Sequence, residues 1–273
     1  MTLSADFSAV PVSQHAAEIQ RLCDAMEAAG RAGRYPRLTV ERPWSAHNPV
    51  LDGEFASPAA IRWYLERELG RLAASGARIS VSSGREALDL HDPRLGPAVD
   101  ETRWDLRRKK LFLFAPERMA LSIDRLQHYT GTPAGSFQRY VLLTNYSWHV
   151  EEFRAALPDS AGPESDGRQM PAWHHMRPGR AGVSIVNIGV GPANAKTITD
   201  HLAVLRPDLI LMIGHCAGLR NHQSIGDLVL ATGYVRDDRV LDEMLPLSVP
   251  VGSNHALNTL LLGEVSARRL RSR

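Results

Sequence analysis

In the first half of the chain, hydrophobic residues recur at helical spacing in three segments. We expect one helix over residues 14–29 with Gly30 at its end, a second from Ser57-Pro58 to Gly76, and a third that ends near Gly131. Each predicted helix carries an apolar face: Ile19, Leu22, Cys23 and Met26 in the first, Ile61, Leu65, Leu69 and Leu72 in the second, and Met119, Ile123 and Leu126 in the third.

Short apolar runs between these helices predict strands over residues 37–40, 77–83 and 111–115. The first ten residues are weakly patterned and are expected to be frayed. Residues 41–57 and 84–108 contain proline, glycine or many charges, which is typical of loops. This half of the chain therefore predicts a helix-rich α+β domain over residues 1–135.

The second half of the chain alternates strands with helices. Near-continuous apolar runs predict strands over residues 140–146, 183–190, 208–215 and 227–235, and helical patterns cover residues 149–157 and 194–205. A surface loop over residues 158–169, rich in proline, glycine, serine and charge, separates the first helix from the second strand. Strands of this kind favour parallel pairing with both faces covered. We therefore predict an α/β domain over residues 136–251 and a tail over residues 252–273.

Composition narrows the functional class. The 32 Lys+Arg against 30 Asp+Glu give a net charge of +2, too small for a typical nucleic-acid binder, and 44% hydrophobic residues are usual for a globular protein. Two cysteines are too few for a disulfide scaffold or a Cys-rich zinc site. Without an apolar run of about 18 residues or a signal-peptide pattern, we expect a cytoplasmic protein.

A glycine pair marks the transition from the strand over residues 183–190 to the helix that follows. Gly189 and Gly191 let backbone approach a ligand closely, and the N–H groups of the following turn, around Asn194, are suited to an anion or a polar oxygen. The dinucleotide-binding fingerprint fails here, because its third glycine is replaced by Asn194 and no acid ends the next strand. A tight turn that only joins the two elements has the same pattern, so both interpretations stay open.

The next strand ends in a second glycine-containing loop, with Gly214, His215, Cys216 and Gly218. We expect the two strands to be side by side in a parallel sheet, so that their loops form a crevice at the carboxyl edge, where small molecules bind. His215 is a candidate acid, base or hydrogen-bond donor, or equally a structural histidine. Cys216 is a candidate nucleophile, but a cysteine at such a position is more often a small hydrophobe packed under the loop. His174 and His175 are adjacent on an extended segment and point apart, so we predict no metal site there.

These loops carry a resemblance to a known family. IGVGPANAKTITDHLAVLRPDLILMIGHCAGL at residues 188–219, HQSIGDLVLATGYVRDD at 222–238 and RLQHYTGTP at 125–133 resemble the AMP nucleosidase family, and YPRLTV and YLERELGRLAASGARISV resemble its N-terminal domain. The resemblance covers about residues 35–251. It implies a nucleoside-phosphorylase-like α/β/α sandwich, incomplete in this chain, with the two glycine loops and the strand that starts at Gly226-Asp227 around the nucleoside.

The resemblance implies hydrolysis of AMP to adenine and ribose 5-phosphate by a cytoplasmic enzyme. The family uses no cofactor, assembles as a homo-oligomer, by resemblance a hexamer, and phosphate is a possible effector. Its Met-Glu pair and its catalytic Asp, in a Ser-Asp-Lys stretch, have no counterpart before Arg273. The catalytic residue is therefore not assigned, and we expect a truncated chain with a divergent end after about Val251, inactive and poorly stable by itself.

Phosphorolytic relatives carry an arginine and a Ser or Thr where this chain has Met212 and His215, so the resemblance implies water as the attacking group. Candidates to bind the 5′-phosphate are Arg125, His128 and Lys196; each residue type is also common as a solvated surface charge. Two other classes stay open. One is a non-catalytic nucleotide-binding fragment, and the other, disfavoured by the missing third glycine, is a dinucleotide-dependent oxidoreductase.

Overall fold

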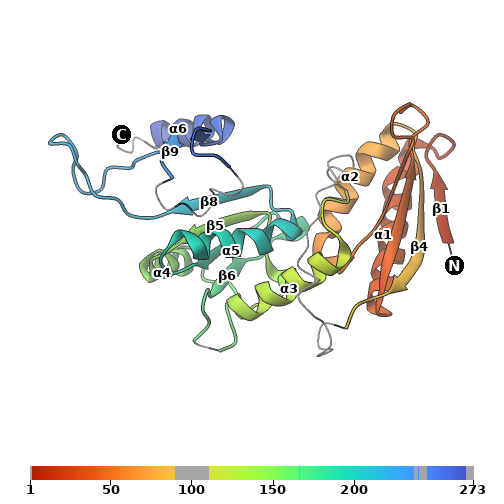
Figure 1. The fold of residues 1–273 in the computed structure, drawn as a ribbon, viewed down its shortest axis with the longest axis horizontal. Helices are drawn as coiled ribbons and strands as arrows, with labels where there is room; N and C mark the ends of the chain where they lie inside the picture. Colours follow the sequence, from red (N-terminus) through yellow and green to blue (C-terminus); the bar gives the residue numbers. More distant parts are fainter. Residues whose placement is uncertain (1, 90–110, 166, 237–238, 240–244, 269–273) are drawn as a thin grey trace. The chain divides into compact units, whose positions relative to one another are not determined.

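The computed structural model (Figure 1) describes residues 2–89, 111–165, 167–236, 239 and 245–268. The chain divides into two compact units. The first comprises residues 1–189 and 197–212, and the second comprises residues 190–196 and 213–273. The first unit contains two four-stranded sheets, and each unit is described by itself below.

The first sheet has the order β1-β4-β2-β3 and is antiparallel throughout. Its strands are β1 Thr2–Asp6, β2 Arg34–Glu41, β3 Val50–Glu54 and β4 Arg78–Glu86. The predicted strands over residues 37–40 and 77–83 are confirmed as parts of β2 and β4. The expectation of a frayed N-terminus is wrong, because residues 2–6 pair along β4 and bury Ala5. Part of the predicted loop over residues 41–57 is also β3, which pairs with β2.

Helices α1 (His15–Arg31) and α2 (Arg62–Ala74) confirm the predicted apolar faces. All four apolar residues predicted for α1 are buried, as are Leu65 and Leu69 of α2. Gly30 lies inside α1 rather than ending it, and the chain reverses at Gly33, which has a φ of +70°. Ser57 and Pro58 begin a 3-10 turn, η2 (Pro58–Ile61), that leads into α2.

The apolar run at residues 111–115 is not the strand that the sequence predicts. Its Leu111 and Phe112 are buried, and the Phe112 ring lies 5.2 Å from the ring of Phe55. The run is apolar because it packs against the first sheet, not because it joins a ladder. Helix α3 (Pro116–Thr130) follows as predicted and ends at Gly131, where φ is +71°.

The second sheet has the order β6-β7-β5-β8. Its strands are β5 Tyr140–Thr144, β6 Ala172–His175, β7 Val183–Asn187 and β8 Leu209–Ile213. β5 and β7 are parallel, as the sequence predicts, and β6, which it does not predict, is antiparallel to β7. Helix α4 (Ser147–Ala156) packs against β5 and β7, and α5 (Pro192–Leu202) with a short turn η7 (Ala203–Leu205) joins β7 to β8 (Figure 1).

Helix α2 meets the start of the second sheet through charged and aromatic side chains. Arg67 of α2 and Arg139 before β5 both contact the Trp63 ring at 4.7 Å, and both form ion pairs with Asp208 before β8. Arg180 donates to the carbonyl oxygen of Ala60 at 2.5 Å. Within the first unit, arginine side chains thus link α2 and the turn before it to the chain segments that lead into the second sheet.

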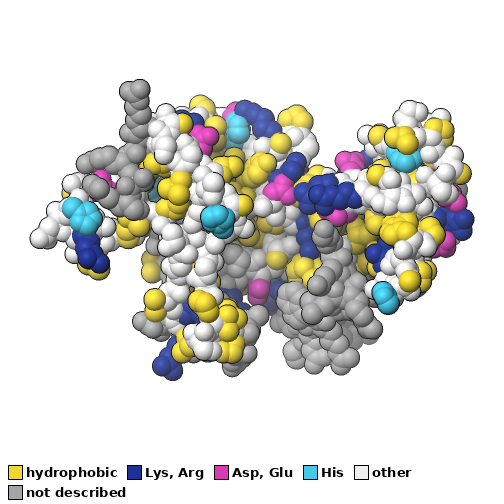
Figure 2. Space-filling view, turned by 90° about the horizontal axis from the view of Figure 1, so that it is seen from above, with side chains coloured by type: hydrophobic (Ala, Val, Ile, Leu, Met, Phe, Trp, Pro, Cys, Tyr) yellow, Lys and Arg dark blue, Asp and Glu magenta, His cyan; other side chains and the backbone are white. Residues whose placement is uncertain are grey.

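In its described residues, the second unit contains the start of α5, a two-stranded ladder and helix α6. β9 (Gly233–Tyr234) pairs with β10 (Val251–Gly252), and the side chain of Asn254 caps α6 (His255–Ala267) by accepting the amide of Leu257. The strand predicted over residues 227–235 is wrong except for β9, since β10 offers only two residues as a partner. Hydrophobic side chains are visible on the molecular surface (Figure 2). The exposed large hydrophobic residues of the second unit include Leu219, Ile225, Val229, Tyr234, Val235 and Leu260.

Candidate functional site

The carboxyl edge of the second sheet carries the polar groups expected of a ligand site. β7 and β5 are parallel neighbours, and the amides of Asp208 and Leu209 donate to the carbonyl of Arg139, so β8 begins beside the beginning of β5. The sequence analysis placed β7 and β8 side by side. This is wrong, because β5 lies between them and the α5 connection passes over one strand.

The first glycine loop turns sharply after β7. The Gly189 amide donates to the Oδ1 of Asn187 at 3.1 Å, and Gly189 and Gly191 have φ values of +65° and +109°. No atom lies within 4 Å of the place that a Cβ on Gly191 would occupy, so the backbone there borders open space. Pro192 begins α5, and the exposed side chain of Asn194 reaches back to the Val190 carbonyl at 3.4 Å. The predicted strand-to-helix transition is confirmed.

The second glycine loop is exposed along its length. Gly214, His215, Cys216 and Gly218 all lie on the surface, in the same unit as Gly191, Asn194 and Lys196. The interpretation of Cys216 as a small hydrophobe packed under the loop is wrong, since the thiol is exposed. The other cysteine, Cys23, is buried in α1, and burial raises the pKa of its thiol to about 12.

The end of β5 contains functional groups that the sequence analysis missed. The Oγ1 of Thr144 lies 2.6 Å from the Nδ1 of His149 and accepts the amide of Tyr146 at 3.2 Å. The Oδ1 of Asn145 is buried without a hydrogen-bond partner among the described residues. The rings of Tyr146 and Trp148 pack against His149. The sequence does contain a signal for these groups: a buried strand that ends in Thr-Asn-Tyr directly before a helix.

The three phosphate candidates lie in two different units. Arg125 and His128 are on α3 in the first unit, where His128 is exposed and its ring lies 5.8 Å from Tyr129. Lys196 is on α5 in the second unit. A role in binding phosphate stays a prediction for all three.

The second half of the chain is similar to known proteins. Residues 139–271 match the model of the phosphorylase superfamily. A solved structure of AMP nucleosidase from Bacteroides thetaiotaomicron VPI-5482 has a TM-score of 0.50, at 24% identity over 57% of this chain and 63% of that one. The nucleoside-phosphorylase-like α/β fold predicted from the sequence is therefore confirmed.

The chain is similar in sequence to two groups of known enzymes. AMP nucleosidase from Escherichia coli K12 is 50% identical over 290 residues, which include 80% of this chain and 60% of the relative, so the predicted resemblance is confirmed. Uridine phosphorylase from Salmonella typhimurium is 27% identical over 40% of this chain and 42% of its own length. The chain spans about 60% of the AMP nucleosidase. The aligned stretch is longer than this 273-residue chain, so the relative carries residues there that this chain lacks.

The adjacent histidines of β6 have separate structural partners. Buried His174 bonds through Nδ1 to the Oγ of Ser184 at 2.8 Å and through Nε2 to the Oγ1 of Thr132 at 2.9 Å. Burial lowers the pKa of His174 to about 4. His175 bonds to Asp159 at 2.7 Å. Among the described residues, no three His, Cys, Asp or Glu side chains form a group that could hold a metal ion.

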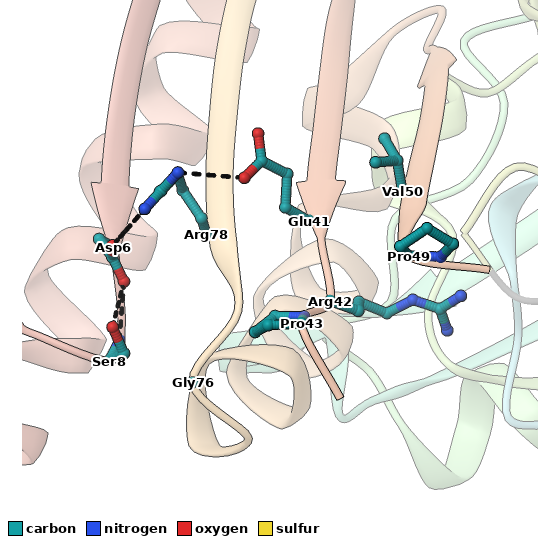
Figure 3. Close-up of a pocket in the computed structure, with 9 residues that line it drawn as sticks. All are labelled: Asp6, Ser8, Glu41, Arg42, Pro43, Pro49, Val50, Gly76 and Arg78. Carbon is teal, nitrogen blue, oxygen red and sulfur yellow. Dashed lines mark hydrogen bonds and ion pairs between the residues drawn. The ribbon is translucent and has the colours of Figure 1, made fainter. Parts of the chain in front are cut away.

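A cavity of about 440 Å³ opens at one end of the first sheet (Figure 3). Arg78 of β4 forms ion pairs with Asp6 at 2.9 Å and with Glu41 at 3.2 Å. Hydrogen bonds from Ser8 and Arg78 lower the pKa of Asp6 to about 2. Arg78 is thus shared by two carboxylates, and Arg42, which also lines the cavity, has an Nε that is buried without a hydrogen-bond partner among the described residues. No helix in the described part of the chain is long and apolar enough to span a membrane.

Proposed function

We propose that the protein hydrolyses the N-glycosidic bond of AMP to adenine and ribose 5-phosphate. The observation that carries the proposal is the 50% identity to AMP nucleosidase over 80% of this chain. The fold supports it, since the glycine loops follow strands of a nucleoside-phosphorylase-like sheet.

The proposed site is formed by both glycine loops, and its substrate is AMP. Gly189 and Gly191 give the nucleotide close access to the backbone, and Asn194, Gly214, His215, Cys216 and Gly218 complete the binding surface. Cleavage passes through an oxocarbenium-like transition state, which needs an acid at the departing purine and a nucleophile on the opposite face of the ribose. The acid is not assigned to a residue of this chain.

Water is the proposed nucleophile. Met212, about half exposed, occupies the position at which phosphorolytic relatives carry an arginine by resemblance, and a thioether cannot neutralise a phosphate dianion. We further propose Arg125, His128 and Lys196 as candidates for the 5′-phosphate, free phosphate as an effector, no cofactor, and a cytoplasmic homo-oligomer, by resemblance a hexamer. We also propose the domain boundaries 1–135, 136–251 and 252–273.

Product analysis tests the reaction. The protein is incubated with AMP in phosphate buffer and in a phosphate-free buffer of equal ionic strength, and the products are separated by chromatography. Any AMP that is cleaved is expected to give adenine and ribose 5-phosphate in both buffers. Ribose 1,5-bisphosphate as the main product in phosphate would contradict hydrolysis. Binding of AMP without release of adenine would instead support the second candidate, a non-catalytic nucleotide-binding module.

A further inference from the structure

The end of β5 lies directly beside the beginning of the first glycine loop. In the parallel register of β5 and β7, Thr144 is opposite Asn187, and the amide of Ile188 donates to the carbonyl oxygen of Thr144 at 2.8 Å. The amide of Gly189 then donates to the side chain of Asn187. Asn145, the residue after Thr144, therefore leaves the sheet at the same edge as the loop that we assign to AMP.

The side-chain amide of Asn145 lacks a hydrogen-bond donor. Its Oδ1 is buried, and no described residue donates to it. The neighbouring Oγ1 of Thr144, in contrast, is engaged by the Nδ1 of His149 and by the amide of Tyr146. A buried amide oxygen without a donor is unfavourable, because it has lost its water and gained no partner in exchange. A ligand that supplies the missing donor would remove this cost.

The Asn145 side chain can turn toward a ligand without losing a hydrogen bond of Oδ1. The residue as a whole is only partly buried, since it lies in the bend between β5 and Ser147, where α4 begins. The terminal torsion of an asparagine is soft, and Oδ1 has no described partner to give up. A donor at this edge of the sheet can therefore engage the amide at little conformational cost.

Of the three parts of AMP, the ribose matches this amide best. A phosphate dianion offers acceptor oxygens, which do not satisfy an amide oxygen. Adenine offers one amino group on a wide, rigid ring. The ribose carries two adjacent hydroxyl groups, and each of them can donate to an amide oxygen or accept from an amide nitrogen. A hydroxyl is also small enough to reach an oxygen that is recessed among protein atoms.

We propose that Asn145 binds a ribose hydroxyl group of the nucleotide, so that the site prefers ribonucleotides to deoxyribonucleotides. The proposal rests on the proposed function, because the nucleotide that it names is AMP. One hydroxyl donates to Oδ1 of Asn145, and Nδ2 is a donor for the adjacent hydroxyl. Asn145 is thus a specificity-determining residue for the sugar, a contact that the two glycine loops leave unassigned.

Calorimetry with AMP, 2′-deoxy-AMP and 3′-deoxy-AMP tests the contact in the full chain. The wild type should bind AMP about 5- to 30-fold more tightly than at least one deoxy analogue, since that analogue leaves the amide oxygen unpaired. Asn145→Ala should bind AMP more weakly by a similar factor and should no longer distinguish it from that analogue. Asn48→Ala, at an exposed asparagine of the first unit, is the matched control and should bind all three like the wild type.

Thermal unfolding without nucleotide separates this role from a structural one. Asn145→Leu keeps the size of the side chain and removes its polar atoms. The variant should unfold at the same or a higher temperature than the wild type, because a buried acceptor without a donor is gone, and it should lose AMP affinity as Asn145→Ala does. A purely structural role predicts a lower unfolding temperature with the preference for AMP unchanged. If Asn145→Leu does not fold, Asn145→Ala still decides.

The proposal is overturned if Asn145→Ala keeps the wild-type preference for AMP over both analogues, or if the wild type has no such preference or does not bind AMP. Weaker binding of free adenine by Asn145→Ala would also overturn it, since the amide would then contact the base. AMP binding without hydrolysis contradicts the proposed function alone and leaves this comparison intact. In a preparation that hydrolyses AMP, the same comparison is made on KM, and hydrolysis that is indifferent to Asn145 contradicts this proposal alone.

Discussion

Acid is expected to destabilise the first unit through His174. Both ring nitrogens of this buried residue are engaged, by Ser184 and by Thr132, and burial lowers its pKa from an ordinary 6.5 to about 4. The Oγ of Ser184 also accepts the amide of Gln138 at 2.8 Å. The network is complete with a neutral imidazole, so a proton on His174 would break a hydrogen bond and place a charge in the core.

The magnitude follows from the two pKa values. A pKa near 6.5 in the unfolded chain and about 4 in the folded one corresponds to about 3 kcal/mol of free energy. The folded pKa is depressed, so below pH 6.5 the unfolded chain takes up a proton that the folded chain does not. The contribution is therefore fully present above pH 6.5, is lost as the pH falls toward 4, and does not fall further below that.

Urea denaturation measured between pH 7.5 and pH 4 tests this reasoning, with tryptophan fluorescence as the signal; Trp173 is the neighbour of His174 in β6. His174→Gln keeps hydrogen-bonding groups but does not titrate, so the stability advantage of the wild type over this variant should shrink by about 3 kcal/mol across the range. His47→Gln, at an exposed position, is the control and should follow the wild type. Parallel loss of stability in wild type and His174→Gln would refute the reasoning.

Three further substitutions test the ion pairs of Asp208 and the conformations of two glycines. Asp208→Ala should lower the free energy of unfolding, measured by urea denaturation, by about 2 to 4 kcal/mol, because Arg67 and Arg139 lose the carboxylate that they share. A loss below about 0.5 kcal/mol would argue against a stabilising role of these ion pairs. Gly84→Ala should lower the free energy of unfolding, measured by thermal unfolding, by about 2 kcal/mol or more, since its Cβ would lie 1.7 Å from the Tyr35 carbonyl oxygen at a φ of +62°. The control Gly33→Ala also has a positive φ but meets no neighbouring atom among the described residues, so it should lower stability less. Equal losses in the two variants would contradict the clash. Gly191→Val should abolish AMP binding in calorimetry without changing the circular dichroism spectrum, and unchanged affinity would leave this loop as a simple turn.

The sequence was sufficient for the elements with strong periodicity. The buried faces of α1, α2 and α3, the helix end at Gly131 and the parallel relation of β5 and β7 were all predictable, since each depends on local spacing or on strands apolar on both faces. The resemblance to AMP nucleosidase was recognisable as well, because the glycine loops that carry it are continuous stretches of sequence. The site assignments made from those loops stay predictions.

Tertiary structure decided what depends on partners distant in the chain. β1, β3 and β6 are too short and too mixed in pattern to be recognised alone, and each exists because a neighbouring strand satisfies its backbone groups. Pairing with distant strands likewise explains why only β9 forms within the strand predicted over residues 227–235, and why β5 lies between β7 and β8. The contact between the Arg206 guanidinium and the Tyr64 ring, 5.2 Å apart, is the clearest case. Arg206 lies 142 positions from Tyr64 along the chain, and since charge–charge and cation–π energies depend on distance in space, no sequence spacing could reveal the pair.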